Sequence, residues 1–393
     1  MPTRRALITS AGAGAVLLGA LGYRAWDRGV FTSGEGDAYT PWQEWRGTDI
    51  DGPHRPLRAG ILAANPHDTQ PWLFSISASG ITVFADRSRD LGTFDPFRRE
   101  MHLGLGAAVE NLVHAANAFG QGPQVVPVEG RLTLSPGPEP VRAALVMLDA
   151  SPPERDPLFL AIPLRHTNRG PYRERAIVPD DLRLFADQIS SDRVRVAFIA
   201  DPKAKHEMGN MIVESTQRIV ADPQMSQDSA HWFRTGAKEI AQHRDGVTVD
   251  TAGLSPLMVK AAKMMPDQDR ATADQYWLSM TKDTHVGTAS VFGVILVRDR
   301  LSMADSIAAG RAWQRLHLVA TFAGISAQPL NQPVECIDRN AMLGRSDTYE
   351  KSLVQFANAP GWEPTFVFRM GYAERPAQPS PRRPLSDVVK EVA

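Results

Sequence analysis

The sequence predicts an α+β fold in which two copies of one unit are fused in tandem. Each half has short alternating apolar and polar runs, typical of strands, around one long segment with helical spacing. The long segments, 99–120 and 303–324, carry matching residues at a constant offset of 204 (324 minus 120). Small residues let a helix approach its neighbour closely, so we expect the same helix–helix contact to be built twice. Coincidence between two Ala-rich core helices is the alternative. The matched positions are Gly106, Ala108, Leu112, Ala116 and Gly120 in the first half and Gly310, Ala312, Leu316, Ala320 and Gly324 in the second.

The first half is expected to span residues 55–150. Ser79-Gly80 is a hairpin signal between two of its strands, and Gly120 is a C-cap for its long helix. Helices are predicted at 57–64 and 99–120, and strands at 73–78, 81–86, 125–128, 131–134 and 141–148.

The second half is expected to span residues 151–376, and it opens with a Pro-rich linker at 151–157. A basic tail, 377–393, follows its last strand. Helices are predicted at 180–189, 203–221 and 303–324, and strands at 194–200, 292–298 and 365–372.

Composition excludes several classes of protein. The 393 residues are 43% hydrophobic and 22% charged, which is ordinary for a globular chain long enough for two domain-sized units. The formal net charge is −1 and no basic block stands out, so we expect no nucleic-acid partner. The single cysteine, Cys336, excludes an internal disulfide and a cysteine-only metal cluster. The ten histidines lack the spacing of known metal motifs, so no catalytic metal is expected.

The N-terminus has the pattern of an export signal. Arg4-Arg5 precedes an uncharged run, Ile8 to Tyr23, rich in Ala, Gly and Leu. The pair followed by a mildly hydrophobic segment resembles a twin-arginine signal, and the run is close to membrane-spanning length. We therefore expect residues 1–26 to be a signal or an uncleaved anchor and 27–54 to be a tether. The expected location is the periplasm or its membrane surface; a disordered tail of a cytoplasmic protein is the alternative.

The helix-to-strand junction Asn65-Pro66-His67-Asp68-Thr69-Gln70-Pro71-Trp72 is the first candidate for a binding site. Such a junction can present backbone N–H groups and side-chain amides to the polar edge of a flat ligand. An ordinary Asx-Pro turn is the alternative.

Two arginine-containing stretches are candidates for a phosphate site, because guanidinium groups donate in a bidentate manner and stay charged. Arg165-His166-Thr167-Asn168-Arg169 directly follows what we expect to be an apolar strand, and Arg382-Arg383 lies near the C-terminus, beyond the last strand. Either stretch can instead be a solvated charged run.

The junction 65–72 resembles a loop of the FMN-dependent nitroreductase superfamily, A-P-S-x-x-N-x-Q-P-W, which contacts the flavin ring edge. Arg165, Thr167 and Arg169 are similar to that family's R-x-S-x-R-like phosphate element, and Arg382 and Arg383 to its C-terminal basic pair. The family pattern has Ser and Asn where this chain has Asn65 and Asp68, which puts the usual loop geometry in doubt unless Asp68 accepts from flavin N3–H.

The double length resembles the Acg-type branch of that superfamily, in which an intrachain pseudo-dimer holds one flavin. The resemblance implies one FMN per chain, because the second half has no N-x-x-x-x-Q-P-W loop of its own. Gln332 belongs to a segment resembling the one near flavin N5, although Gln332-Pro333 can simply start a loop. The FMN-binding residues implied are Asn65, His67, Asp68, Thr69, Gln70, Arg165, Thr167, Arg169, Gln332, Arg382 and Arg383.

Residues 222–291 have no counterpart in the first half, and we interpret them as a lid over the flavin or as a peripheral helical hairpin. The resemblance implies an oxidoreductase that passes hydride through FMN N5 in a ping-pong cycle, between small-molecule donors and acceptors such as nitroaromatics or quinones. A flavin-sequestering protein with a closed lid and little turnover is the main alternative. A membrane-tethered structural protein without flavin is the third. No catalytic side chain is assigned.

Overall fold

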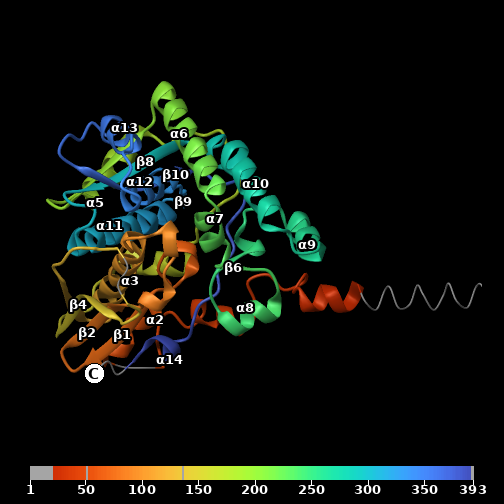
Figure 1. The fold of residues 1–393 in the computed structure, drawn as a ribbon. Coiled ribbons are helices and arrows are strands. Elements are labelled where there is room, and N and C mark those ends of the chain that lie inside the picture. The colour runs from red at the N-terminus through yellow and green to blue at the C-terminus, as the bar shows by residue number, and fades with distance from the viewer. Residues whose placement is uncertain (1–20, 50–51, 135–136, 391–393) are drawn as a thin grey trace, which may run out of the picture.

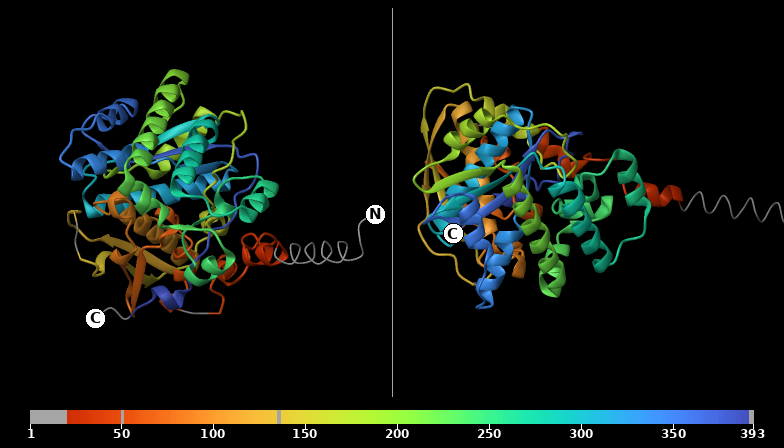
Figure 2. Two further views of the ribbon diagram at one scale, coloured as in Figure 1. Left: turned by 45° about the vertical axis from the view of Figure 1, so that its right-hand side comes forward. Right: turned by 90° about the horizontal axis from the view of Figure 1, so that it is seen from above.

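The computed structural model describes residues 21–49, 52–134 and 137–390. Within them the fold is α+β, with two four-stranded antiparallel sheets, many helices and one small two-stranded sheet. The two large sheets lie on opposite sides of a central pair of long helices (Figures 1 and 2). The predicted fold class, α+β with antiparallel sheets and long helices, is therefore confirmed.

The first sheet has the strand order β1-β2-β4-β3, with every neighbouring pair antiparallel. The strand predicted at 131–134 is wrong: Arg131 forms only an isolated bridge to Ser302, and the amide of Leu132 donates to Leu301 O, so this segment crosses to the other half. The elements of this half are α2 (Leu57–Gly60), β1 (Trp72–Ser77), β2 (Gly80–Ala85), α3 (Arg99–Ala118), β3 (Gln121–Pro127) and β4 (Val141–Ala150). α4 (Pro157–Ala161), a helix where a strand is expected before Arg165, follows the predicted boundary at 150 and packs on the core of this half.

The second sheet has the order β5-β8-β10-β9 and is also antiparallel. Helices cover both of its faces, so β8 is buried along its whole length. Its elements are α5 (Pro179–Ile189), β5 (Val194–Ile199), α6 (Pro202–Ala221), β8 (Val291–Val297), α11 (Met303–Phe322), β9 (Ser326–Pro329), α12 (Gln332–Met342), α13 (Tyr349–Phe356) and β10 (Glu363–Gly371).

The two sheets share one connectivity. In each, a first and a second strand are neighbours, one 20-residue helix follows the second strand, and two further strands complete the sheet (β1-β2-α3-β3-β4 and β5-β8-α11-β9-β10).

The central helices α3 and α11 cross at their glycines. A Cβ on Gly106 would lie 2.2 Å from Ile307 O, and one on Gly310 would lie 2.0 Å from Leu103 O. The two contacts are equivalent under the predicted offset of 204 residues, because position 103 corresponds to 307 and position 106 to 310. We expected the contact to be built twice; instead the two helices pack on each other in one shared crossing.

Residues 222–291 lie at one side of the molecule, to the right in Figure 1. Short helices surround a two-stranded parallel sheet, so the segment is not a helical hairpin. Its elements are α7 (Pro223–Ala230), β6 (Phe233–Arg234), α8 (Ala237–His243), β7 (Val247–Thr248), η7 (Val249–Thr251), α9 (Pro256–Met264), α10 (Arg270–Met280) and η8 (Thr281–Val286).

The predicted tether is packed rather than loose over its described part. Tyr39 and Trp42 of η1 (Asp37–Trp42), together with Trp45, are buried in the core of the first half. Removing these large apolar surfaces from water stabilises the packed position. The C-terminal segment also returns to the first half: α14 (Leu385–Val388) follows Pro384, and the amide of Lys390 donates to Phe74 O.

The described residues include no helix long and apolar enough to span a bilayer. Most of the predicted signal, residues 1–20, lies outside the described part of the chain.

Candidate functional site

The loop between α2 and β1 is held in an unusual backbone conformation. His67, Asp68 and Gln70 have positive φ angles of 47°, 54° and 49°. Non-glycine residues in this region cost roughly 1–3 kcal/mol each and persist where the surroundings enforce them, often at functional sites. The amide of Gln70 donates to Asn65 Oδ1 at 2.7 Å, which closes the loop on itself.

Both central helices position the start of this loop. A Cβ on Gly104 of α3 would lie 3.1 Å from Asn65 Cβ, so the absence of a side chain lets α3 pack directly on the loop. From α11, Gln314 Oε1 accepts from the amide of Ala64 at 3.2 Å.

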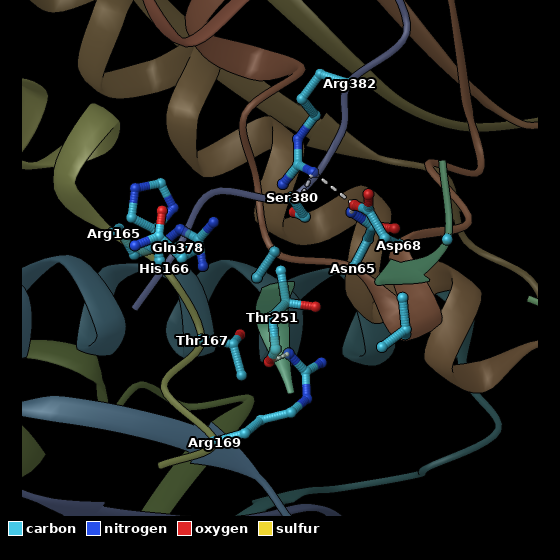
Figure 3. A pocket seen from close by; sticks show the side chains of 13 residues that line it. Asn65, Asp68, Arg165, His166, Thr167, Arg169, Thr251, Gln378, Ser380 and Arg382 are labelled. Atoms are coloured by element: carbon cyan, nitrogen blue, oxygen red, sulfur yellow. Dashed lines mark hydrogen bonds and ion pairs between the residues drawn. The ribbon is translucent and has the colours of Figure 1, made fainter. Parts of the chain in front are cut away.

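A cavity of about 40 Å³ lies beside the loop. Figure 3 shows side chains from the loop, from 165–169, from the 246–251 segment and from the C-terminal segment around one space. Its lining comprises Ala64, Asn65, Asp68, Arg165, His166, Thr167, Arg169, Gly246, Val247, Thr251, Gln378, Ser380 and Arg382.

Arg382 joins the C-terminal segment to the loop. Its Nη1 donates to Asp68 Oδ1 at 2.6 Å (Figure 3). Its Nη2 donates to Ala63 O at 3.1 Å. The guanidinium also stacks 4.8 Å from the centroid of Trp42. Burial lowers the pKa of Arg382, and the Asp68 carboxylate opposes that shift.

Arg165 is buried, and no carboxylate among the described residues pairs with it. Its Nη2 donates to Leu62 O at 3.2 Å, and its Nη1 lies 3.5 Å from His317 Nδ1. Among the described atoms, none accepts from its Nε. Burial, followed by the charge of Arg382, lowers the pKa of Arg165 to about 9.

Arg169 adds a third guanidinium at the opposite wall. Its Nη1 donates to Thr251 O at 3.2 Å, and burial lowers its pKa. Of the described residues lining the cavity, Asp68 alone is a carboxylate, against three arginines. The side chains around this space therefore carry an excess of positive charge in a buried setting, which favours an anionic ligand.

Asp68 keeps one oxygen available. Burial raises the pKa of its carboxyl to about 6, although Arg382 and Asn65 both favour the charged form. Its Oδ2 is buried and, as far as the described residues go, has no hydrogen-bond partner. That oxygen can accept from an N–H donor of a ligand.

The structure brings together six of the predicted residues: Asn65, Asp68, Arg165, Thr167, Arg169 and Arg382 line the cavity. Asn65 donates through Nδ2 to Asp68 Oδ1 at 3.2 Å, so it also orients that carboxylate.

The other five predicted residues do not line the cavity. His67 Nε2 lies 3.0 Å from Ser229 Oγ, and burial lowers the pKa of His67 to about 4. Thr69 is fully buried, and Gln70 uses its Oε1 to accept from the amide of Arg383 at 2.8 Å.

Arg383 and Gln332 also lie outside the cavity lining. The Arg383 guanidinium donates to Asp387 O at 3.0 Å and to Gln70 O, so it turns away from the other arginines. Gln332 is the first residue of α12 and has Pro333 next to it, a usual helix start, so it begins a helix rather than a loop.

Sequence reasoning did not single out His166, Gly246, Val247, Thr251, Gln378 and Ser380 as lining residues. His166 stands inside the arginine stretch and Ser380 two residues before Arg382, so proximity to those motifs was a usable signal. Thr251 is 82 residues from its hydrogen-bond partner Arg169, and nothing local to it indicates that contact.

The 222–291 segment is fastened to the loop. Gly246 N donates to Asp68 O at 3.1 Å, and Gln70 Nε2 donates to Arg244 O at 2.8 Å. Asp245 forms ion pairs with both Arg89 and Arg234. These bonds hold 244–251 over the cavity.

No family model matches the chain, but comparison with individual proteins gave relatives. Two Mycobacterium tuberculosis proteins, from two strains and both named as NAD(P)H nitroreductases, are 23% identical over 349 residues, covering 85% of this chain and 90% of theirs. Among solved structures, a Desulfitobacterium hafniense nitroreductase with bound FMN aligns with a TM-score of 0.37 and 14% identity, over 61% of this chain and 100% of its own. The NfnB nitroreductase of Mycobacterium smegmatis, solved with NADPH, aligns with a TM-score of 0.35 and 16% identity, over 58% and 95%.

Proposed function

We propose that the chain is a member of the nitroreductase superfamily that binds FMN and acts as an oxidoreductase. The names of the two mycobacterial relatives, matched over 85% of this chain, support the superfamily. The resemblance of residues 65–72, 165–169 and 382–383 to flavin-binding elements supports the same reading, and three of these arginines meet at one cavity.

The observation that carries the proposal is the buried excess of arginine. Arg165, which is buried, and Arg169, which is half-buried, have no carboxylate partner among the described residues. A cation withdrawn from water in this way is unfavourable unless an anion joins it. A phosphate group fits this donor set, because guanidinium groups bind phosphate oxygens with charge-assisted bonds.

The residues of the chain would hold the two ends of FMN differently. Arg165, Arg169 and Thr167 would hold the phosphate, and Asp68 Oδ2 would accept from a ring N–H. When bound, FMN supplies hydride transfer through its N5. The protein would orient the ring and exclude water and competing acceptors. A ping-pong cycle with a small-molecule donor and a nitroaromatic, quinone or similar acceptor follows from the resemblance.

We further propose that the two halves are a tandem duplication forming an intrachain pseudo-dimer of the Acg type. The shared strand order of the two sheets and the reciprocal crossing of α3 and α11 support it. In this pseudo-dimer the flavin loop belongs to the first half, 55–150, and Arg165 and Arg169 belong to the second, 151–376. Arg382 belongs to the C-terminal tail that follows.

The localisation is also a proposal. The twin arginines followed by an uncharged run support export to the periplasm with membrane anchoring by the N-terminal segment. Export through that route suits a protein that folds around its cofactor first.

The visible spectrum of the full-length chain, purified in mild detergent, tests the proposal. Full length is preferable because Arg24 donates to Met264 O and Met265 O, contacts that a 26-residue truncation would remove. Flavin absorbance that survives desalting, and bleaches on anaerobic addition of NAD(P)H or a reduced quinone, is expected. A protein that stays colourless after FMN reconstitution contradicts the proposal.

The flavin-sequestering alternative is favoured by one observation. The 244–251 segment is bonded to the loop and contributes Gly246, Val247 and Thr251 to the cavity lining, so access of a substrate to a flavin held there would depend on this segment. A yellow protein that no small-molecule reductant bleaches would identify the sequestering function.

A further inference from the structure

The three most exposed large apolar side chains of the described residues lie on the N-terminal segment and on α9, which contact each other. Leu257, Phe31 and Trp26 are 78%, 77% and 74% exposed, the three highest values among large hydrophobic residues in the described ranges. Large contiguous apolar surface on a folded protein marks a contact with a partner or a membrane. We define the apolar face as Tyr23, Trp26, Phe31, Leu257, Met258 and Met265.

Two chain segments form this face, and polar bonds fix them to each other. Residues 21–27 are helical, and from that helix Arg24 donates to Met264 O at 3.0 Å and to Met265 O at 2.6 Å, at the end of α9. Lys263 of α9 donates to Gly29 O at 2.9 Å and pairs with Asp250 at 2.8 Å. Figure 1 shows α9 beside this N-terminal helix, far from α5.

The inner side of the same segments is polar and buried, with Lys263 bonded to Gly29 O and paired with Asp250. The outer side is apolar and exposed. Lys263 is 5% exposed and Asp250 is 6% exposed, yet the aromatic rings and Leu257 point to solvent. Lys260 Nζ lies 5.9 Å from the Phe31 ring centroid, so one cation borders the face. The exposed side is thus a surface without a partner in the described chain.

We propose that this apolar face rests on a lipid bilayer, so that the folded body itself, and not only the N-terminal segment, contacts the membrane. The uncharged run Ile8 to Tyr23 leads into the face, and its last residue, Tyr23, belongs to it. Tyr and Trp rings are favoured at the membrane–water boundary because they have an apolar body and a polar edge.

The charge of this region indicates the type of binding. Residues 21–33 and 256–267 each carry two cations and one anion, and Arg28 is paired with Asp267 at 2.7 Å. With so little net charge, attraction to anionic headgroups contributes little and burial of apolar surface dominates. Binding should therefore depend only weakly on salt and on anionic lipid.

A single introduced thiol tests the proposal in the full-length chain. The native Cys336 is buried, so Leu257→Cys supplies the reactive site for a polarity-sensitive fluorophore. Leu184→Cys is the matched control, an exposed leucine on α5. Each labelled chain is reconstituted into phosphatidylcholine vesicles, with and without phosphatidylglycerol, whose acyl chains are brominated or unbrominated.

The proposal requires that brominated acyl chains quench the label at 257 strongly, equally with and without phosphatidylglycerol, and leave the label at 184 unchanged. Phe31→Cys should behave like Leu257→Cys. An unquenched label at 257 in vesicle-bound protein overturns the proposal, because the N-terminal segment alone would then hold the chain. Equal quenching of the labels at 257 and 184 overturns it as well, and so does a failure to bind vesicles. Shielding of the label at 257 without lipid, growing with protein concentration, also overturns it, because a second copy of the chain would then cover the face.

Discussion

Arg165 differs from most buried arginines in having no carboxylate partner in the described structure. It is held by the carbonyl of Leu62 and lies against a histidine whose pKa is well below its ordinary value, because burial and the Arg165 charge disfavour the protonated form. A buried cation in such surroundings costs free energy in the absence of an anion. Ligand binding and stability of the ligand-free protein should therefore respond to its removal in different ways.

We expect Arg165→Met to weaken FMN binding by about 1.5–3 kcal/mol, the worth of a lost charged hydrogen bond. The free energy of unfolding without FMN should not fall, because replacing a buried charge with an apolar side chain of similar size is often neutral or stabilising. Fluorescence titration with FMN and urea denaturation of the flavin-free protein measure the two quantities.

Arg383→Ala is the matched control for that prediction. Arg383 is a neighbouring basic residue, but its guanidinium donates to Asp387 O and Gln70 O and does not line the cavity. Its removal should change FMN affinity by less than about 0.5 kcal/mol, as for a substitution outside the site. Equal losses in both variants would contradict the placement of the phosphate beside Arg165.

His114 gives a prediction about pH. Its Nε2 lies 3.3 Å from Glu110 Oε1 and its Nδ1 bonds Asp156, the N-cap of α4. Burial opposes the charge of the imidazole, but these two carboxylates prevail and raise the pKa of His114 to about 9 from 6.5. The folded state therefore binds an extra proton between pH 6.5 and 9, and stability falls as pH rises through that window.

Wild type should lose roughly 2–3 kcal/mol of unfolding free energy between pH 6.5 and 9 through this group. His114→Gln should remove most of that slope, whereas replacing the exposed His206 by Gln should leave it intact. Urea denaturation at several pH values provides the measurement. An unchanged slope in His114→Gln would show that the carboxylates do not hold its proton.

At the scale of elements, the crossing of α3 and α11 depends on two glycines. A Cβ at either position would meet backbone of the other helix at 2.2 Å or less, and backbone atoms cannot turn aside. Gly106→Ala and Gly310→Ala should each cost about 1–3 kcal/mol through overpacking. Because one separation of the helices relieves both clashes, the double variant should cost less than the sum.

Urea denaturation of the four proteins in this cycle, wild type included, measures the coupling. Gly236→Ala is the control, since Gly236 lies at the start of α8 with open space around the added Cβ. Additive costs at Gly106 and Gly310 would mean that the two clashes are relieved independently.

Elements with strong periodicity were predictable from sequence. α3 begins at Arg99 and α11 at Met303, as predicted, and their ends differ by two residues. The 222–291 segment was not predictable in the same way because its helices are short and their positions depend on contacts such as Asp245 with Arg89. The sequence identified the arginines of the cavity as candidates, but it did not show where their side chains point. Arg382 and Arg383 are adjacent, yet only the first has the Asp68 carboxylate as a partner at hydrogen-bonding distance.

At the scale of the whole molecule, the cavity is lined by both proposed halves and by the C-terminal tail. The loop comes from the first half, 165–169 and 246–251 come from the second, and Arg382 comes from the tail. The 222–291 segment lines this cavity through Thr251 and supplies Leu257 to the apolar face. On the buried side of the same helix α9, Lys263 pairs with Asp250, the neighbour of Thr251. The proposed membrane contact and the cavity therefore lie on one bonded segment.

The pseudo-symmetry of the sheets raises the question of a second cavity, and the connections argue against it. The first half has eleven residues, 61–71, between α2 and β1, and these form the loop with three positive φ angles. The equivalent connection before β5, residues 190–193, has four, too few for such a loop.

We therefore expect one FMN per chain at saturation, measured by flavin absorbance against protein concentration and by calorimetric titration. In Arg165→Met the calorimetric stoichiometry should stay near one while affinity falls, because a single site is weakened. Two flavins per wild-type chain would show that the second half builds its own site from residues other than a loop before β5.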